Sequence, residues 1–417
     1  MCRFRLLLLW HFRLNEMKHA SIIPLIGGEA IASERAFGTP IDAIFTFEAF
    51  EANETHLLSW YKDRGIDVPY HVLDKRKPHI KKGTYKVVSS VCPCAGLSLF
   101  SMSAGANNPT NEWMIKAAEY VMGELGPEVY WGENAPALVG DMGAPIREKL
   151  IAIGKKYGYS ASFFRTESLK HGVPQVRRRV FYFFWKGDKV PLLEYFNREY
   201  TKIEDVIMGA RGNSLQEPIN KKKPTDDPYY RYLLEVVKGG ITHRQFFDSI
   251  DPDDISVRYY DAKSMIEQSG HTYDQVGKWM AKNGYPGEVD KCVRNAKKLG
   301  EGMNIMRRGT IVPKDHIGAF VGHYPMMLTH PHEDRYITYR EALTIMGMPD
   351  DFQLLGPKGN HNHICQNVPV QTATDLAVEV KNVLDGKREY IDTSALIQYN
   401  STQSYKNIEK SGGSTLF

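Results

Sequence analysis

Between residues 21 and 185, short apolar runs alternate with segments of helical pattern, and this alternation restricts the fold more than any other feature of the chain. The strand-like runs are 21–26, 43–47, 71–73, 85–91, 128–131 and 179–185. The segments with helical character are 29–37, 51–63, 112–125 and 145–157. Such alternation is typical of parallel, doubly wound sheets, which bind ligands at the carboxyl ends of their strands. The sequence therefore predicts an α/β fold with a ligand site along one edge of the sheet.

The pattern changes after about residue 190, where segments become shorter and richer in Pro, Gly and polar turns. Helical patterns return near residue 338, where Thr338 and Glu341 have capping-box spacing, and a last helix is expected over 372–384. Residues 400–417 are rich in Ser, Thr, Asn and Gly, which predicts a frayed end. The predicted parts are an N-terminal extension (1–16), the α/β domain (17–190), a smaller irregular domain (191–329), a return segment (330–388) and a C-terminal tail (389–417).

Charge and cysteine content exclude few classes of function. The 417 residues include 53 Lys and Arg against 49 Asp and Glu, a net charge of +4, which does not by itself indicate nucleic-acid binding. Basic side chains cluster in 165–189 and 291–314, either as solvated faces or as contacts along a phosphate backbone. No apolar run is long enough for a membrane helix, and the five cysteines lack zinc-site spacing, so neither a membrane anchor nor a metal is expected.

Three short segments carry residues suited to chemistry. Cys94 follows a strand-like run and precedes a Gly-containing loop, which suits an exposed nucleophile, although buried inert cysteines are equally common. Glu133 follows the next strand-like run, where it could be an acid or merely a charge at a helix N-terminus. Arg177 and Arg179 alternate on an extended segment and could meet an anion or serve as edge-strand charges.

Together these segments resemble the DNA cytosine-5 methyltransferase family. That family has a Pro-Cys loop, then Glu-Asn, then Gly-Val-Pro-Gln-x-Arg-x-Arg, and this chain has the same order. The matching segments are Pro93-Cys94, Glu133-Asn134 and Gly172–Arg179, with further similarity at 335–341 and 348–352. The resemblance covers roughly 20–190 and 330–385, and it implies a Rossmann-like methyltransferase sheet. The segment 191–329 would be the smaller, irregular target-recognition domain, inserted before the return segment.

The resemblance implies a reaction and a role for each matching residue. Cys94 would add to C6 of a flipped cytosine in a short double-stranded DNA sequence, which makes C5 able to accept a methyl group. Glu133 would supply or share a proton at N3, while Arg177 and Arg179 would hold the base's carbonyl oxygen and orient Glu133. Further residues would contact the substrate: Ser98, Asn134 and Gln175.

By the same resemblance the methyl donor is S-adenosylmethionine. Backbone N–H groups around Gly27-Gly28 would lie near its methionine part, Glu48 would bind the ribose and Asp74 the adenine amine. The expected cofactor residues are Ile23, Ile26, Gly27, Gly28, Glu48, Asp74, Pro93, Gln366, Asn367 and Val368. The chain departs from the family's pattern at Pro24 and Leu25 in the first glycine loop, at Ala95 after the nucleophile and at Gln366 in the C-terminal loop.

The resemblance leaves two other functions open: a tRNA cytosine-5 methyltransferase, and a DNA-binding relative that has lost cofactor binding. The expected partners are double-stranded DNA and, as a candidate, a restriction endonuclease with the same target. We expect a monomer. The expected location is the cytoplasm of a bacterial or phage-infected cell, or the nucleus if the source is eukaryotic.

Overall fold

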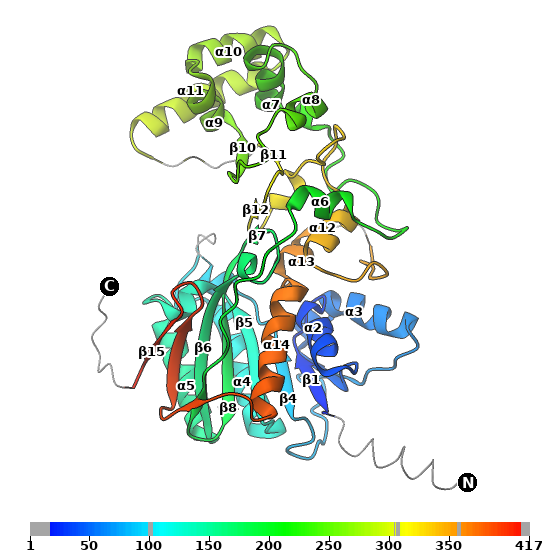
Figure 1. Ribbon diagram of the computed structural model, residues 1–417, viewed down its shortest axis with the longest axis vertical. Helices are drawn as coiled ribbons and strands as arrows, with labels where there is room; N and C mark the ends of the chain where they lie inside the picture. The colour runs from blue at the N-terminus through cyan, green and yellow to red at the C-terminus, as the bar shows by residue number, and fades with distance from the viewer. Residues whose placement is uncertain (1–16, 99–102, 304, 306–308, 357–359, 410–417) are drawn as a thin grey trace. The chain divides into compact units, whose positions relative to one another are not determined.

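The computed structural model describes residues 17–98, 103–303, 305, 309–356 and 360–409 (Figure 1). The predicted N-terminal extension over 1–16 therefore lies outside the described residues. Contacts divide the chain into two compact units. Unit 1 consists of the described parts of Met1–Val173, Arg177–Glu199 and Gln366–Phe417, and unit 2 consists of those of Pro174–Val176 and Tyr200–Cys365.

Unit 1 is built on a sheet of nine strands within the described residues, in the order β15-β14-β6-β8-β5-β4-β1-β2-β3. The strands are β1 His19–Ile22, β2 Ala43–Thr46, β3 Tyr70–Val72, β4 Val87–Ser90, β5 Val129–Asn134, β6 Tyr159–Glu167, β8 Arg178–Lys186, β14 Ala395–Tyr399 and β15 Ser404–Asn407. A separate short pair joins β9 Val190–Pro191 to β13 Tyr390–Ile391. The four-residue strands β1, β2 and β4 are buried along their whole length, as expected of strands covered on both faces.

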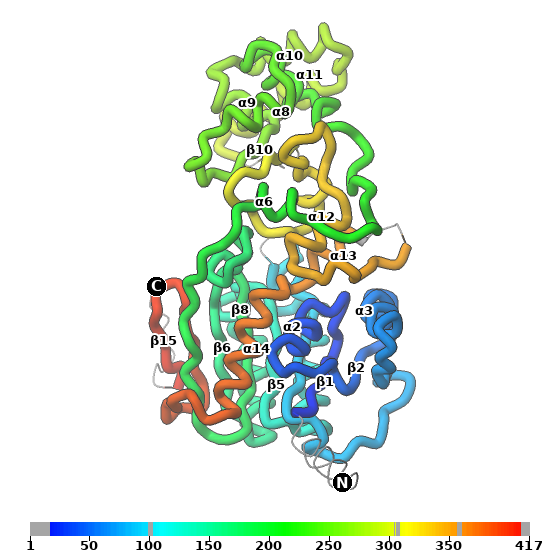
Figure 2. Tube along the Cα trace, turned by 45° about the vertical axis from the view of Figure 1, so that its right-hand side comes forward, coloured from blue at the N-terminus to red at the C-terminus, as the bar shows by residue number. Residues whose placement is uncertain are grey.

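The helices of unit 1 begin and end close to the positions that the sequence predicts. They are α2 Gly28–Phe37, α3 Glu51–Asp63, α4 Glu112–Tyr120, α5 Ala144–Lys156 and α14 Val370–Leu384. Helix α2 ends at Gly38, whose φ of 81° is the left-handed conformation that glycine adopts most easily. Helix α14 packs along α2 (Figures 1 and 2), which places the start of α14 beside the glycine loop that follows β1.

The sheet differs from the predicted parallel sheet in two respects. Strand β8 runs antiparallel to both β5 and β6, and β6 itself was absent from the prediction. The predicted C-terminal tail also contributes strands: β14 pairs in parallel with β6, and β15 pairs antiparallel with β14. The prediction of a frayed end over 400–417 is therefore wrong for β15, because pairing with β14 compensates for its polar composition. Residues 410–417 lie outside the described residues.

Unit 2 is mainly helical, whereas the sequence predicted an irregular domain. Its helices are α6 Ile203–Met208, α7 Pro228–Tyr232, α8 His243–Asp248, α9 Ala262–Ser269, α10 Tyr273–Lys282, α11 Pro286–Gly300, α12 Tyr339–Ile345 and most of α13 Asn360–Gln366. Its short strands are β7 Gln175–Val176 with β12 Ile317–Gly318, and β10 Arg258–Tyr260 with β11 Thr310–Val312. Buried aromatic and aliphatic side chains from α7 to α11, including Tyr230 and Phe246, form a core of their own. The sequence analysis did not predict this core, because the helices are short and are separated by Pro, Gly and polar residues typical of turns.

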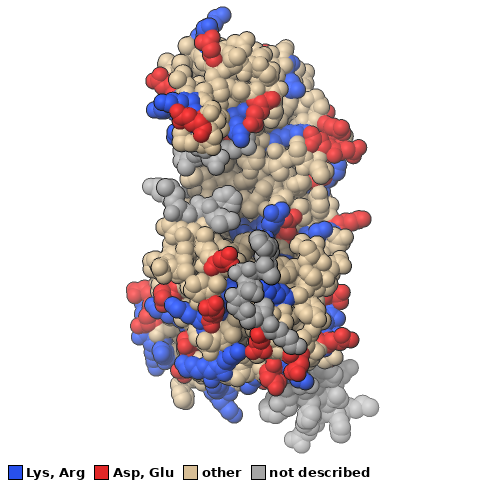
Figure 3. Space-filling model, turned by 90° about the vertical axis from the view of Figure 1, so that its left-hand side faces the viewer, with Lys and Arg blue, Asp and Glu red and all other residues tan. Residues whose placement is uncertain are grey.

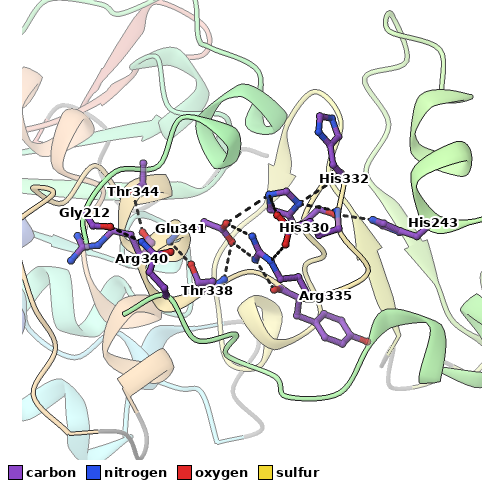
Figure 4. Close-up of polar contacts among 12 residues, drawn as sticks. Gly212, His243, His330, His332, Arg335, Thr338, Arg340, Glu341 and Thr344 are labelled. Atoms are coloured by element: carbon purple, nitrogen blue, oxygen red, sulfur yellow. Dashed lines mark hydrogen bonds and ion pairs between the residues drawn. The ribbon is translucent and has the colours of Figure 1, made fainter. Parts of the chain in front are cut away.

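A polar network orders the segment before α12 (Figure 4). Thr338 and Glu341 form the predicted capping box, with Thr338 Oγ1 accepting from the Glu341 amide at 3.1 Å. Arg335 donates to both carboxylate oxygens of Glu341, at 2.9 and 2.7 Å. Helix α12 packs against α6, so residues 330–365 belong to unit 2 by packing. The contact boundaries thus fall near residues 200 and 365, instead of the predicted 190 and 330.

Candidate active site

The Cys94 thiol lies just beyond β4, at the edge where the parallel strands end. Cys94 precedes a short 3-10 helix, Ala95–Leu97, and its carbonyl accepts a hydrogen bond from the Leu97 amide at 3.0 Å. The turn is tight, since a Cβ at Gly96 would come within 2.3 Å of Asn111 Oδ1. A glycine two residues after the cysteine therefore lets the loop fold back and present the half-buried thiol.

Glu133 and Arg179 form a nearly buried ion pair beside it. Glu133 lies within β5, one residue before the strand ends, and pairs in register with Phe181 of β8. The antiparallel neighbour brings Arg179 Nε within 2.6 Å of Glu133 Oε1, with side-chain exposures of 11% and 3%. Arg178, between the two other arginines, faces away and pairs with Glu167 at 2.7 Å.

The charged groups at this edge of the sheet shift the pKa of the Cys94 thiol. Burial raises the pKa of Cys94 above its ordinary value, and the negative charge of Glu133 raises it further. Arg179, and to a smaller extent Arg177, counteract this by favouring the thiolate. Cys94, Glu133 and the pair Arg177 and Arg179 come from three separate segments of the chain and thus share one electrostatic environment.

Arg177 is fully buried and holds the C-terminal loop. Its Nη2 donates to the carbonyl oxygen of Asn367 at 2.9 Å, and Asn367 Oδ1 accepts from the Gly28 amide at 2.9 Å. A Cβ at Gly28 would come within 2.3 Å of the Val368 carbonyl oxygen, so the loop lies directly on the start of α2. Asn367 and Val368 are buried, while Gln366 is exposed.

The three predicted substrate residues have different environments. Asn134 Nδ2 donates to the Cys92 carbonyl at 3.4 Å, which ties the end of β5 to the nucleophile loop. Gln175 is buried in unit 2, where Oε1 accepts from the Phe320 amide at 3.0 Å and Nε2 contacts Met346 Sδ at 3.6 Å. Ser98 is half-buried after the 3-10 helix. The side chains of Asn134 and Gln175 thus form hydrogen bonds with backbone groups elsewhere in the protein.

The glycine loop after β1 has an unusual backbone. Ile23 and Leu25 both have φ of 54° and Gly27 has φ of 94°, so three residues adopt left-handed conformations. The amides are engaged within the protein: Ile23 donates to Phe45 O at 2.9 Å and Gly27 to Pro24 O at 2.8 Å. The Gly27 and Gly28 amides therefore both donate to acceptors within the protein. Ile26, like Ile23, is buried.

Glu48 and Asp74 meet at the ends of β2 and β3. The Glu48 amide donates to Asp74 Oδ1 at 3.0 Å, and the Glu48 side chain is 66% exposed. Asp74 lines a cavity of about 480 Å³ together with Phe47, Leu73 and Trp113. The sequence analysis missed Phe47 and Trp113; an aromatic residue directly before Glu48 was the available signal. Carboxylate acceptors beside aromatic rings suit a nucleoside, whose hydroxyls donate and whose base stacks.

The described residues contain no group of three or more His, Cys, Asp and Glu side chains arranged to hold a metal ion. They also contain no helix long and apolar enough to cross a bilayer.

The fold is similar to the folds of solved methyltransferase structures. It matches a solved structure described as a DNA modification methyltransferase encoded within a prophage of E. coli, with a TM-score of 0.51, 15% identity, and coverage of 88% of this chain and 99% of that one. It also matches the Entamoeba histolytica methyltransferase EhMeth, with a TM-score of 0.51, 12% identity, and coverage of 89% and 99%. The predicted methyltransferase-type α/β fold is therefore confirmed, with a mixed sheet.

Residues 17–382 match the family described as C-5 cytosine-specific DNA methylase, and the chain belongs to that family. It is similar to the Type II methyltransferase M.MthTI of Methanothermobacter thermautotrophicus, at 22% identity over 301 residues covering 70% of this chain and 78% of that protein. It is also similar to M.Bpa9945I of Bacillus paralicheniformis, at 21% over 323 residues covering 70% and 69%. The predicted enzyme class, a DNA (cytosine-5-)-methyltransferase, is confirmed, and its substrate is DNA.

Proposed function

We propose that unit 1 methylates C5 of a cytosine in DNA through a covalent adduct between Cys94 and C6. The observation that carries this proposal is the grouping of Cys94, Glu133 and Arg179 at the adjacent ends of β4, β5 and β8. A thiol, a carboxyl and a guanidinium in one partly buried site are the groups that nucleophilic addition to a pyrimidine requires.

Each group has a defined task. The Cys94 sulfur forms a bond to C6, and the electron pair displaced from the C5–C6 double bond moves into the ring. Glu133 holds a proton at N3, and Arg179 keeps the Glu133 carboxyl in place through the 2.6 Å ion pair. After C5 accepts the methyl group, a base or water removes the C5 proton and the sulfur leaves. Because C6 lies inside the duplex stack, the cytosine must first be flipped out.

S-adenosylmethionine supplies an electrophilic methyl group when it is bound. The cavity beside Phe47, Asp74 and Trp113 fits its adenine, with Asp74 accepting from the amine and Glu48 from the ribose hydroxyls. The backbone around Ile23, Ile26 and the glycine pair, together with Pro93 and the loop Gln366–Val368, would border the methionine part. The Gly28–Asn367 hydrogen bond sets the distance between these two loops.

Target recognition would reside in residues 191–329, most of which lie in unit 2. A cleft of about 920 Å³ in that unit is lined by three lysines (Lys222, Lys291 and Lys298) and three carboxylates (Asp227, Asp261 and Glu288), so it offers both donors and acceptors to base edges without an excess of positive charge. The relatives' Type II names support a role in restriction-modification, with a restriction endonuclease for the same target as partner. We propose a monomer as the active form.

The test is transfer of labelled methyl from S-adenosylmethionine to unmethylated DNA and to bulk tRNA in parallel, with the nucleosides identified by mass spectrometry. The expected product is 5-methyldeoxycytidine in the DNA arm only. Label in RNA alone would move the substrate to tRNA. A protein that binds DNA but shows neither product nor cofactor-dependent thermal stabilisation would contradict the proposal.

The Cys94→Ala variant separates chemistry from binding. Without the sulfur nucleophile, methyl transfer is expected to vanish while DNA affinity changes by less than about twofold, because one small half-buried side chain contributes little to a DNA interface. Duplex binding measured by fluorescence anisotropy provides the comparison. Substantial turnover by this variant would exclude the covalent mechanism.

A further inference from the structure

A small basic cavity lies at the same edge of unit 1 as Cys94, outside the candidate active site. Its volume is about 240 Å³, and it is lined by Arg165, Thr166, Glu167, Lys170, Arg178 and Ser401. Three cations surround it and only one carboxylate contributes to its wall. On the face of unit 1 that Figure 3 shows, Lys and Arg side chains are interspersed with Asp and Glu.

The cations of the cavity differ in how far they are neutralised. Arg178 Nε pairs with Glu167 Oε2 at 2.7 Å, and Lys170 Nζ donates to the neutral Asn197 Oδ1 at 2.9 Å. Within the described residues, no carboxylate pairs with the exposed Arg165 guanidinium. The cavity therefore keeps positive charge in excess of its single carboxylate, with donors that an oxyanion can accept.

The pairing register of β5, β8 and β6 gives the distance between this cavity and Glu133. Val180 of β8 pairs with Asn134 of β5 on one side and with Arg165 of β6 on the other. Two strand spacings of about 4.8 Å therefore separate the Arg165 backbone from the residue next to Glu133, a distance of about 10 Å. One DNA strand rises about 3.4 Å per nucleotide, so this distance corresponds to about three nucleotides.

The charged cavity residues of β6 and β8 lie on one face of the sheet, and Arg179 and Glu133 lie on the other. Glu167 is directly opposite Arg178, and Arg165 lies two residues before Glu167, so these three side chains share one face. Arg179 is opposite Thr166 on the other face, the face of its partner Glu133. The Thr166 hydroxyl contacts His171 Nε2 at 2.8 Å and accepts from Asn400 at 3.0 Å, so it is already engaged. The anion donors are thus separate from the residues proposed for chemistry.

We propose that Arg165, Lys170 and Arg178 bind a phosphodiester of the substrate DNA within about three nucleotides of the flipped cytosine. The inference rests on the proposed function for the position of the cytosine. The contact neutralises one backbone phosphate, fixes the register of the duplex on unit 1 and takes no part in methyl transfer. It assigns a task to three members of the basic cluster over 165–189 that take no part in the candidate active site.

The test is the salt dependence of duplex binding by Arg165→Gln and by the double variant Arg165→Gln/Lys170→Gln, measured by anisotropy. Loss of one phosphate contact is expected to reduce the slope of log affinity against log salt by about 0.9. The KM for DNA should rise several-fold while kcat stays unchanged, because the reacting groups are intact. Thermal unfolding of each variant shows that it is folded.

Lys186→Gln is the matched control, since Lys186 is an exposed basic residue at the opposite end of the same strand β8. Its slope should equal that of the wild type; an equal decrease would show a general charge effect and overturn the inference. Unchanged slope and affinity in both cavity variants would also overturn it. A reduced slope in a protein that methylates nothing would leave the phosphate site standing while the proposed function fails.

A second arm distinguishes DNA from free phosphate. Thermal unfolding is compared in inorganic phosphate and in chloride at equal ionic strength, for the wild type and Arg165→Gln. Stabilisation by phosphate that disappears in Arg165→Gln, with DNA affinity unaltered, would assign the cavity to a free anion and refute the DNA contact. Reduced DNA affinity in the variant is the result expected here.

Discussion

At the residue scale, neighbouring groups shift the pKa of the Cys94 thiol in opposite directions. Burial and Glu133 raise its pKa, Arg179 and Arg177 oppose that rise, and the net effect leaves the pKa of the thiol above its ordinary value. Cys92, two residues earlier, is an instructive contrast, because its burial without a cation raises its pKa to about 12. Two guanidinium groups act on the pKa of Cys94, whereas no cation among the described residues acts on that of Cys92.

The Arg179→Gln variant should slow alkylation of Cys94. Removing this cation withdraws a group that lowers the pKa of Cys94 and leaves Glu133 uncompensated, so the thiolate fraction falls at any given pH. The pH at which iodoacetamide labelling of the Cys94 peptide reaches half its maximal rate should shift upward, as read by mass spectrometry. Arg178→Gln, on the opposite face, is the control and should label like the wild type; an equal shift in both would refute the assignment.

At the scale of elements, α2 joins the sheet, the glycine loop and the C-terminal loop. Its first residue, Gly28, contacts Asn367 and Val368, and α14 packs along its length. Its second residue, Glu29, is buried and accepts hydrogen bonds from Ser89 Oγ at 3.2 Å and from Ser21 Oγ. This helix therefore contacts both loops and, through Glu29, the strands β1 and β4.

Gly28→Ala tests the close approach of the two loops. The new Cβ would overlap the Val368 carbonyl and the Asn367 amide, so the loop Gln366–Val368 must move. We expect a loss of about 1–3 kcal/mol in unfolding free energy, with weaker S-adenosylmethionine binding, as measured by denaturant titration and calorimetry. Gly287→Ala, where a Cβ meets nothing within 4 Å, is the control. Wild-type cofactor affinity in Gly28→Ala would argue against a cofactor role for these loops.

Glu29→Gln should stabilise the protein more at pH 8 than at pH 5. Burial raises the pKa of Glu29 to about 7, above its value in the unfolded chain, so the neutral carboxyl is favoured on folding. The stability that this gives is fully present below about pH 4.3 and is lost as pH rises through 7. Glutamine stays neutral throughout, so the Tm difference between the variant and the wild type should grow over that range. A constant difference would contradict a buried neutral Glu29.

At the scale of the whole molecule, the chain passes between two compact units more than once, because Pro174–Val176 belongs to unit 2 while both flanking segments belong to unit 1. Gln175 and Arg177, two residues apart in one motif, therefore lie in different units. Gln175 bonds to Phe320, and Arg177 bonds to Asn367. This motif thus connects the two units along the chain and carries Arg177 and Arg179, which act on the pKa of Cys94.

A chain that starts at Met17 should retain full activity. The family match begins at residue 17, and β1 begins at His19, so the matched region and the first described strand both lie after residue 16. Methyl transfer and Tm of the shortened chain should both equal those of the full chain. Loss of activity in a folded, shortened chain would show that residues 1–16 take part in function.

Local sequence determined much of this protein. Alternating strand and helix patterns, the Gly38 cap and the Thr338–Glu341 capping box depend on neighbouring residues, and each is present in the structure. The order of the Pro93-Cys94, Glu133-Asn134 and Gln175–Arg179 segments was sufficient to indicate the family that residues 17–382 match. These features depend on steric preference and motif order, which a chain carries without reference to distant segments.

Tertiary structure decided what depends on contacts between distant segments. The antiparallel placement of β8, the addition of β14 and β15, and the helical core of unit 2 follow from pairing and packing across long stretches of chain. The Arg177–Asn367 hydrogen bond joins residues 190 positions apart, and no local pattern records it. Strand register and buried polar partners are selected by the energy of the assembled core, so only the folded molecule shows that Arg177 holds a loop while Arg179 holds Glu133.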